Sequence, residues 1–105
     1  MDSVLRMIGL AKRAGKVVTG AEIVESAVKK GKARLVVIAT DISENGRKAI
    51  TDTCKYYKVK YIECGLKEDL GRYTGSESRA VISINDYRFA DSVLKKYAEV
   101  IDREE

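Results

Sequence analysis

Residues 19–41 read TGAEIVESAVKKGKARLVVIATD, and this stretch predicts a helix that leads into a buried strand. Thr19 and Glu22 have the spacing of a capping box, in which two side chains accept hydrogen bonds from free backbone N–H groups at a helix start. The helix would bury a stripe of apolar residues at helical spacing, made of Val24, Ala27 and Val28. The apolar run 35–39 is typical of a central strand that is covered on both faces.

The same alternation of helix and strand extends over the rest of the chain. Segments with apolar residues at helical spacing separate the expected strands, which are residues 16–18, 35–39, 59–63 and 80–84. Strands that alternate with helices indicate an α/β fold. We therefore predict a three-layer α/β/α sandwich with a small, four-stranded central mixed sheet.

Polar residues before the expected helices predict how these helices begin. Ser43 is expected to cap the third helix and Asn85 the last one. An Asp that leaves a strand is commonly a cap or a turn former, so we interpret Asp41 in this way rather than as a catalytic acid. The third helix is expected to bury a stripe made of Ala49, Ile50, Cys54 and Tyr57.

The length and composition indicate one small domain. The 105 residues are enough for one hydrophobic core and too few for two. No apolar run reaches the roughly 20 residues that span a bilayer, and the first residues lack the apolar segment of a signal peptide. We expect a cytoplasmic, monomeric protein without a membrane partner, with one domain over residues 1–100 and a frayed acidic tail over 101–105.

Catalytic and metal sites find little support in the residues. Histidine is absent, which removes the commonest general base and the commonest metal ligand. Glycine-rich nucleotide-binding motifs and the zinc-protease motif are absent as well. Cys54 and Cys64 lack the spacing of a metal-binding pair and lie in apolar contexts, so we interpret them as reduced core thiols. We predict no catalytic residue, no metal and no cofactor.

Basic residues are concentrated in the N-terminal half of the chain. The net charge is +4, with ten Lys and Arg against five Asp and Glu over residues 1–48, and ten against eleven over residues 49–105. This asymmetry fits two interpretations equally well: a polyanionic partner, or a surface that only keeps the protein in solution.

The start of the second helix is the better candidate for a polyanion site. Lys12, Arg13 and Lys16 precede it, and the backbone N–H groups and the dipole of a helix start favour phosphate. Gly20 has no side chain, which leaves room for another backbone to approach. At least two of the four cations at the far end of this helix are interpreted as compensation of its dipole; these cations are Lys29, Lys30, Lys32 and Arg34.

Four blocks of sequence carry a resemblance to a known family. They read KRAGKVVTG at 12–20, AVKKGKARLVVIATD at 27–41, CKYYKVKYIE at 54–63 and LKEDLGRYTG at 66–75. In this order and spacing the chain resembles the kink-turn-binding ribosomal proteins of the L7Ae/L30e type, and most nearly their bacterial YlxQ-like branch. The resemblance covers about residues 5–89. It implies an α/β/α sandwich that grips kinked RNA with the N-terminal end of its second helix.

The resemblance also implies which residues meet RNA. In the family this helix start reads G-x-N-E-x-x-K, where Asn and Glu meet sheared G·A pairs and Lys meets the RNA backbone. The corresponding residues here are Gly20, Ala21 at the variable position, and Glu22, Ile23 and Ser26 in place of Asn, Glu and Lys. The family's second contact is the loop before the last strand, which corresponds to residues 75–80, with Arg79 as its one cation.

The three substitutions have physical consequences for kink-turn recognition. Glu22 can accept but not donate a hydrogen bond, Ile23 can do neither, and Ser26 carries no charge. Each lost contact to a base edge costs on the order of 1–3 kcal/mol, so two lost contacts lower the affinity by about two to four decades. The sequence therefore predicts an RNA-binding scaffold with weakened kink-turn specificity.

The predicted function is that of a small, non-catalytic RNA-binding protein associated with the ribosome or with another structured RNA, such as ribosomal RNA or a kink-turn-like RNA. The candidate RNA-binding residues are Lys12, Arg13, Lys16, Thr19, Gly20, Ala21, Glu22, Ile23, Ser26 and Arg79. One alternative is a protein–protein interaction module on the same scaffold, with an apolar docking patch around Ile23. A second is the RNA-recognition domain of a modifying enzyme.

Overall fold

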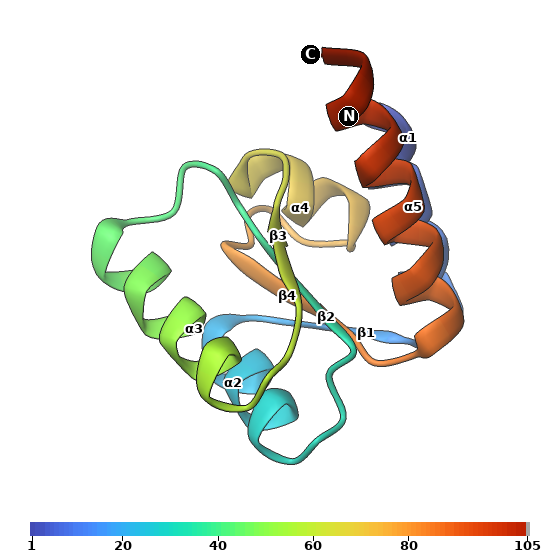
Figure 1. Ribbon diagram of the computed structural model, residues 1–105. Helices are drawn as coiled ribbons and strands as arrows, with labels where there is room; N and C mark the ends of the chain where they lie inside the picture. Colours follow the sequence, from blue (N-terminus) through green and yellow to red (C-terminus); the bar gives the residue numbers. More distant parts are fainter. Residues whose placement is uncertain (105) are drawn as a thin grey trace.

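A computed structural model describes residues 1–104 as a four-stranded sheet between two layers of helices (Figure 1). The helices are α1 (Asp2–Arg13), α2 (Ala21–Lys29), α3 (Glu44–Tyr56), α4 (Lys67–Tyr73) and α5 (Tyr87–Glu104). The strands are β1 (Val17–Thr19), β2 (Leu35–Ile38), β3 (Tyr61–Glu63) and β4 (Val81–Ile84). The predicted α/β/α sandwich is confirmed.

The sheet is mixed, as predicted, and its strand order is β1-β4-β2-β3. β4 runs antiparallel to both β1 and β2, whereas β2 and β3 are parallel. Parallel neighbours start at the same end of a sheet, and an antiparallel neighbour ends where they start. The starts of β2 and β3 and the end of β4 therefore share one end of the sheet, and the start of β4 and the end of β1 share the other.

Each face of the sheet carries its own hydrophobic core. α1, α4 and α5 cover one face, and α2 and α3 cover the other. In β2, Leu35 and Val37 belong to the first core, while Val36 and Ile38 belong to the second. Because successive side chains of a strand point to opposite faces, a doubly covered strand must be apolar throughout. All four residues of β2 are buried, which confirms the expectation of a central strand.

The helix caps match the sequence in one case and differ in another. Ser43 caps α3 as predicted, because its hydroxyl oxygen accepts a hydrogen bond from the Gly46 N–H at 3.1 Å. The prediction that Asn85 caps the last helix is wrong. Asp86 holds that place, since its carboxylate accepts a hydrogen bond from the Phe89 N–H at 3.1 Å.

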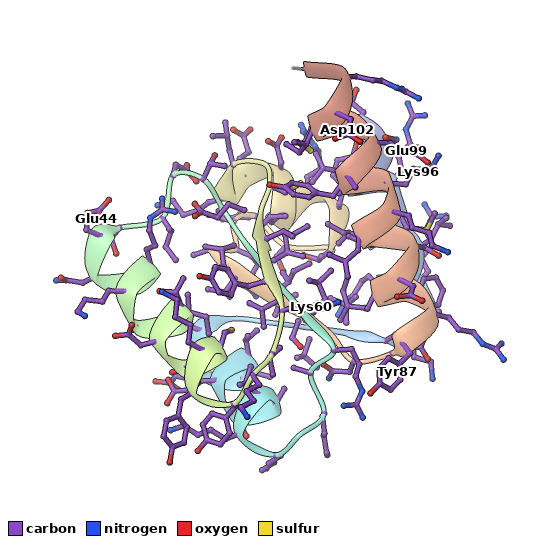
Figure 2. The ribbon with its side chains drawn as sticks, viewed as in Figure 1. Glu44, Lys60, Tyr87, Lys96, Glu99 and Asp102 are labelled. Carbon is purple, nitrogen blue, oxygen red and sulfur yellow. The ribbon has the colours of Figure 1, made fainter. Side chains whose placement is uncertain are left out.

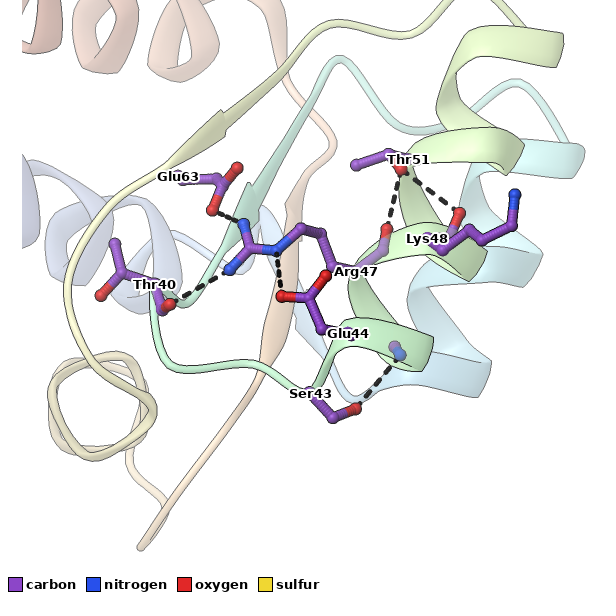
Figure 3. Close-up of polar contacts among 8 residues, drawn as sticks. Thr40, Ser43, Glu44, Arg47, Lys48, Thr51 and Glu63 are labelled. Atoms are coloured by element: carbon purple, nitrogen blue, oxygen red, sulfur yellow. Dashed lines mark hydrogen bonds and ion pairs between the residues drawn. The ribbon is translucent and has the colours of Figure 1, made fainter.

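Three polar contacts attach helices to the sheet end near β3. Arg47 of α3 donates to the Thr40 carbonyl at 3.1 Å and forms an ion pair with Glu63 at the end of β3 (Figure 3). Asp41 accepts a hydrogen bond from the Lys67 N–H at the start of α4, at 2.8 Å. Asp41 is therefore a helix-capping residue, as its position after the strand indicates.

The third helix buries less of its surface than predicted. Ile50 and Cys54 are buried, but Ala49 is exposed and Tyr57 is 41% exposed. α3 ends at Tyr56, and Tyr57 is its C-cap residue, whose ring packs edge-on against Tyr56 with the ring centres 4.9 Å apart. α5 continues into the acidic segment 101–105, whose last residue lies outside the described residues. Among residues 1–104, no helix is both long and apolar enough to cross a membrane.

The two cysteines are free and buried, which agrees with their interpretation as core thiols. Cys54 lies in the core under α2 and α3, and Cys64 lies in the core on the other face. Burial raises the pKa of each thiol to about 11, because a thiolate is poorly stabilised away from water. Among the described residues, no group of three or more His, Cys, Asp or Glu is placed to hold a metal ion.

Candidate nucleic-acid interface

The start of α2 is formed by a glycine rather than by the predicted capping box. Gly20 is the N-cap residue, and no side chain caps the helix. Thr19 belongs to β1, where it pairs with Ile82, and its hydroxyl accepts a hydrogen bond from Arg79. The predicted reciprocal cap between Thr19 and Glu22 is therefore wrong. Thr19 is still part of β1, and the N-cap position falls one residue later, at Gly20.

Gly20 is required at this position by its backbone conformation. Its φ of 98° and ψ of 141° lie in a region that residues with a side chain rarely adopt. A Cβ atom at Gly20 would have no heavy atom within 4 Å, so the space beside it is open. The glycine thus reverses the chain from β1 into α2 and leaves the helix end accessible.

The first turn of α2 presents backbone N–H groups that the helix itself does not use. The first intrahelical hydrogen bond runs from the Val24 N–H to the Gly20 carbonyl, at 2.9 Å. The N–H groups of residues 21–23 precede this bond, and no side-chain cap occupies them. Together with the positive end of the helix dipole, such groups favour a bound anion.

The side chains around this helix end are mixed in character. Ala21, Glu22 and Ile23 are exposed, and the exposed fraction of Ile23 is 58%. Glu25 forms an ion pair with Lys29 at 2.7 Å, which offsets part of its negative charge. Glu22 is therefore the main acidic side chain beside the first turn, and Ile23 adds an apolar contact surface.

The loop before β4 lies directly against the start of α2. Arg79 Nε donates a hydrogen bond to Thr19 Oγ1 at 3.1 Å, and the Gly20 N–H donates to the Val81 carbonyl at 3.1 Å. The loop packs closely over α4, since a Cβ atom at Gly71 would lie 2.6 Å from the Glu77 backbone. The two segments that the family resemblance implies as RNA contacts are thus held side by side.

Lys12 and Arg13 line an open groove of about 830 Å³ between α1 and the end of α4. Both side chains are exposed, and neither forms an ion pair with any residue in the described part of the chain. Two further cations line the groove, Arg6 and Arg72, of which Arg72 pairs with Asp69 at 2.7 Å. At Gly75 the groove meets the loop that carries Arg79.

Lys16 lies apart from the other predicted site residues. Its carbonyl accepts a hydrogen bond from the Asn85 N–H at 2.8 Å, which places it at the end of the sheet where β4 stops. Gly20 lies at the opposite end of β1, about 13 Å away at the usual rise of a strand. The structure therefore brings together the start of α2 and Arg79, and it separates Lys16 from them. Lys12 and Arg13 lie at the end of α1, on the Lys16 side, and their groove reaches the loop before β4 only at Gly75.

Sequence reasoning missed Arg6 and Arg72 as members of this basic groove. Arg6 and Arg13 are separated by two helical turns, so their spacing places them on one face of α1. That signal was available from the sequence. Arg72 could not be assigned in the same way, because its place opposite α1 depends on how α4 packs in the fold.

Comparisons with known proteins agree on one family. The family described as the ribosomal protein L7Ae/L30e/S12e/Gadd45 family matches residues 2–93. The chain is 40% identical to the RNA-binding protein YlxQ of Bacillus subtilis over 84% of this chain and 88% of that protein. It is 35% identical to the large ribosomal subunit protein eL8 of Picrophilus torridus over 95% of this chain and 80% of that protein.

A solved structure gives the same result for the fold. A protein of unknown function from Bacillus halodurans superimposes with a TM-score of 0.84 and 33% identity, over 88% of this chain and 93% of that one. The family match spans most of the chain, including the Gly20 turn and the loop that carries Arg79. The chain belongs to the ribosomal protein L7Ae/L30e/S12e/Gadd45 family.

Proposed function

We propose that this chain is a non-catalytic RNA-binding protein that holds structured RNA against the start of α2 and the loop 75–80. The observation that carries the proposal is the contact between Arg79 and Thr19, which joins these two segments into one surface. Relatives named as an RNA-binding protein and as a ribosomal protein support the same function. Ribosomal RNA and kink-turn-like RNA are the partners that such a surface suits.

Phosphate groups would be held mainly by the backbone and by cations around it. The free N–H groups of residues 21–23 point out of the helix start, and Gly20 leaves the approach to them open. Arg79 stands beside them, half-buried and fixed by Thr19. Lys12 and Arg13 line a separate groove along α1 that reaches the loop before β4 at Gly75, and these cations would contact an RNA backbone that continues across that loop.

Kink-turn recognition would be weaker than in relatives with the full family motif. Glu22 offers only acceptors to a base edge, and Ile23 offers no hydrogen bond. Both side chains are exposed at the helix start, where the family motif places its base contacts. Glu22 also stands close to the N–H groups that favour phosphate, and its charge opposes a bound anion.

A protein-binding function on the same scaffold is the second candidate, and one observation favours it. Ile23 is among the most exposed large apolar side chains of the described residues, and it lies on the face that would meet a partner. Exposed apolar side chains that cluster mark docking sites, whereas single ones are common on protein surfaces. Since Ile23 has polar neighbours in Glu22 and Ser26, we favour RNA.

The salt dependence of RNA binding tests the proposal. With three to five phosphate contacts, the logarithm of the affinity should fall with the logarithm of the salt concentration at a slope of about −2 to −4.5 between about 50 and 200 mM. Arg79→Gln should weaken binding, whereas Arg88→Gln, an exposed change on α5, serves as the matched control. A flat salt dependence, or equal losses in both variants, would argue against this surface.

A further inference from the structure

A second basic surface lies at the end of the molecule opposite the start of α2. Two segments form most of it, KKGKAR at 29–34 and KYYKVK at 55–60. Seven of the chain's 20 Lys and Arg residues fall in these two segments, which contain no Asp or Glu. Compensation of the α2 and α3 dipoles explains Lys29, Lys30 and Lys55, which lie at the ends of these helices, but it leaves the other four cations without a reason.

The sheet topology brings the two segments together. The segment 29–34 leads into β2 and the segment 55–60 leads into β3, and these strands are parallel, with Val36 opposite Tyr61. The backbone confirms the proximity, since the Val36 N–H donates to the Lys60 carbonyl at 3.0 Å. β4 ends at the same place, where the Arg34 N–H donates to the Ile84 carbonyl at 2.8 Å. The start of α5 therefore joins the two segments.

A pocket of about 340 Å³ opens between these elements. Among the described residues, its charged lining is Asp91 against Lys29, Arg34, Lys58 and Lys60, and Lys29 is paired with Glu25 outside the lining. Two tyrosines complete its polar lining, Tyr57 and Tyr87. Figure 2 shows Lys60 and Tyr87 at this end of the sheet, away from the labelled residues of the α5 C-terminal half. The volume lies in the range of small-molecule sites and suits one nucleotide base.

The aromatic side chains are exposed rather than part of either core. Tyr87 is 69% exposed and Tyr57 is 41% exposed. The guanidinium of Arg34 lies over the Tyr87 ring, 4.6 Å from its centre, so the two groups form a cation–π pair. Lys58, at the rim, has a φ of 59°, a left-handed conformation that is uncommon for a residue other than glycine.

Exposed aromatic rings interleaved with cations are the chemistry that binds single-stranded nucleic acid. Unpaired bases stack on aromatic and guanidinium planes, while Lys and Arg neutralise the phosphates between them. Duplex RNA offers no free base face to Tyr57 or Tyr87, and a peptide of Asp and Glu has no aromatic ring to stack on them. We propose that this basic–aromatic surface binds a single-stranded stretch of RNA, with Tyr87 and Arg34 as the stacking platform.

The basic–aromatic surface is separate from the proposed structured-RNA site. The nine residues of α2 separate the two ends by about 14 Å at 1.5 Å per residue. Lys16, which lies at the β4 end of the sheet, falls on the side of the basic–aromatic surface. The inference stands on its own geometry, and it extends the proposed function by giving the same protein a contact for an unpaired segment.

The test uses the full chain and a fluorescein-labelled oligouridylate of about 12 nucleotides, with binding followed by fluorescence anisotropy at about 50 mM salt. Tyr87→Ala should weaken binding about fivefold or more, because loss of one base stack has an effect of that size, and Tyr57→Ala should weaken it as well. Tyr87→Phe, which keeps the ring, should bind within about twofold of the unchanged chain. Circular dichroism would confirm that each variant folds, as expected for exposed positions.

Charge changes and competitors separate this proposal from its alternatives. Lys60→Gln should weaken oligouridylate binding more than Lys48→Gln, an exposed change in the N-terminal half of α3, outside the pocket lining. Inorganic polyphosphate, which carries charge without bases, should compete poorly. If polyphosphate binds as tightly as oligouridylate and Tyr87→Ala has no effect, the surface is a general cation patch and the proposal is overturned. Binding of polyglutamate in place of the oligonucleotide would overturn it as well.

A further variant keeps the two proposed sites distinguishable. Arg79→Gln should leave oligouridylate binding unchanged, because Arg79 lies at the other end of α2. If Arg79→Gln abolishes oligouridylate binding, the single strand binds at the start of α2 and this proposal fails. If structured RNA does not bind at all while oligouridylate binding depends on Tyr87, the proposed function fails and the basic–aromatic surface stands.

Discussion

Restoring the family motif at the start of α2 is the sharpest test of how this protein meets RNA. The triple variant Glu22→Asn, Ile23→Glu and Ser26→Lys returns a donor and two acceptors to the helix end and adds one cation. Glu22 and Ile23 are exposed and Ser26 is half-buried, so the changes remove no core contact. A Glu at position 23 also lies in the first turn, where a negative charge stabilises a helix by about 0.3–1 kcal/mol.

The expected gain follows from the contacts that return. Each good contact to a base edge contributes about 1–3 kcal/mol. Part of this gain is lost because the neighbouring residues do not position the three new side chains as they do in the family. A net gain of about 1.4 kcal/mol corresponds to a tenfold increase in affinity, which we take as the minimum expected. The lysine introduced by Ser26→Lys would lie one turn from Lys30, and this repulsion costs only about 0.2–0.5 kcal/mol.

Fluorescence anisotropy with a labelled kink-turn RNA measures the gain. A second RNA, in which Watson–Crick pairs replace the sheared G·A pairs, shows whether the gain is specific to the kink. The three changes raise the net charge by one, since two of them add a positive unit and one subtracts it. Glu99→Gln on α5 raises the net charge by the same amount and serves as the control. A folded triple variant that binds no better than this control would show that the helix start does not dock RNA as the family motif implies.

Three further outcomes are expected. Gly20→Ala should lower the free energy of unfolding by about 1–3 kcal/mol in urea denaturation, because its φ of 98° strains any residue with a Cβ; no loss would contradict the positive φ. Ser43→Ala should cost about 1 kcal/mol through the lost α3 cap, whereas Ser43→Thr should keep most of the stability if the hydroxyl is responsible. The free energy of unfolding should fall as pH rises from about 9 towards 11, because the thiols ionise in the unfolded chain while burial keeps the pKa of Cys54 and Cys64 at about 11 in the folded one. The loss is at most about 1.4 kcal/mol per pH unit for each thiol. Cys54→Ala should reduce the slope of the free energy of unfolding against pH, as measured by urea denaturation.

The architecture was predictable because each element has a local signal in the sequence. The run 35–39 contains no polar residue, which only a strand covered on both faces requires, and β2 has that place in the structure. Ser43 likewise caps the helix that follows it, because a cap and its helix are neighbours in the chain. Where the determining contacts are local, the sequence is enough.

The wrong predictions share one limit, which is that a local pattern does not fix the residue at which a helix begins or ends. Thr19 has the pattern of a capping residue, but β4 pairs with it and Arg79 occupies its hydroxyl. Tyr57 fits the apolar stripe of α3, yet the helix ends one residue earlier and leaves it exposed. A local pattern predicts a preference, and tertiary contacts decide whether that preference is used.

The two ends of α2 show how the same limit applies to function. At the Gly20 end, the features that favour an anion belong to the backbone and to one short motif, so sequence and family resemblance were enough to predict a site there. At the Lys29 end, the cations of α2 look like simple dipole compensation when they are considered alone. Only the parallel pairing of β2 with β3 places Tyr57 and Lys60 beside Arg34, and only the return of β4 adds Tyr87. A surface built from three separate segments has no signature in any one of them, so its chemistry becomes apparent only in the folded chain.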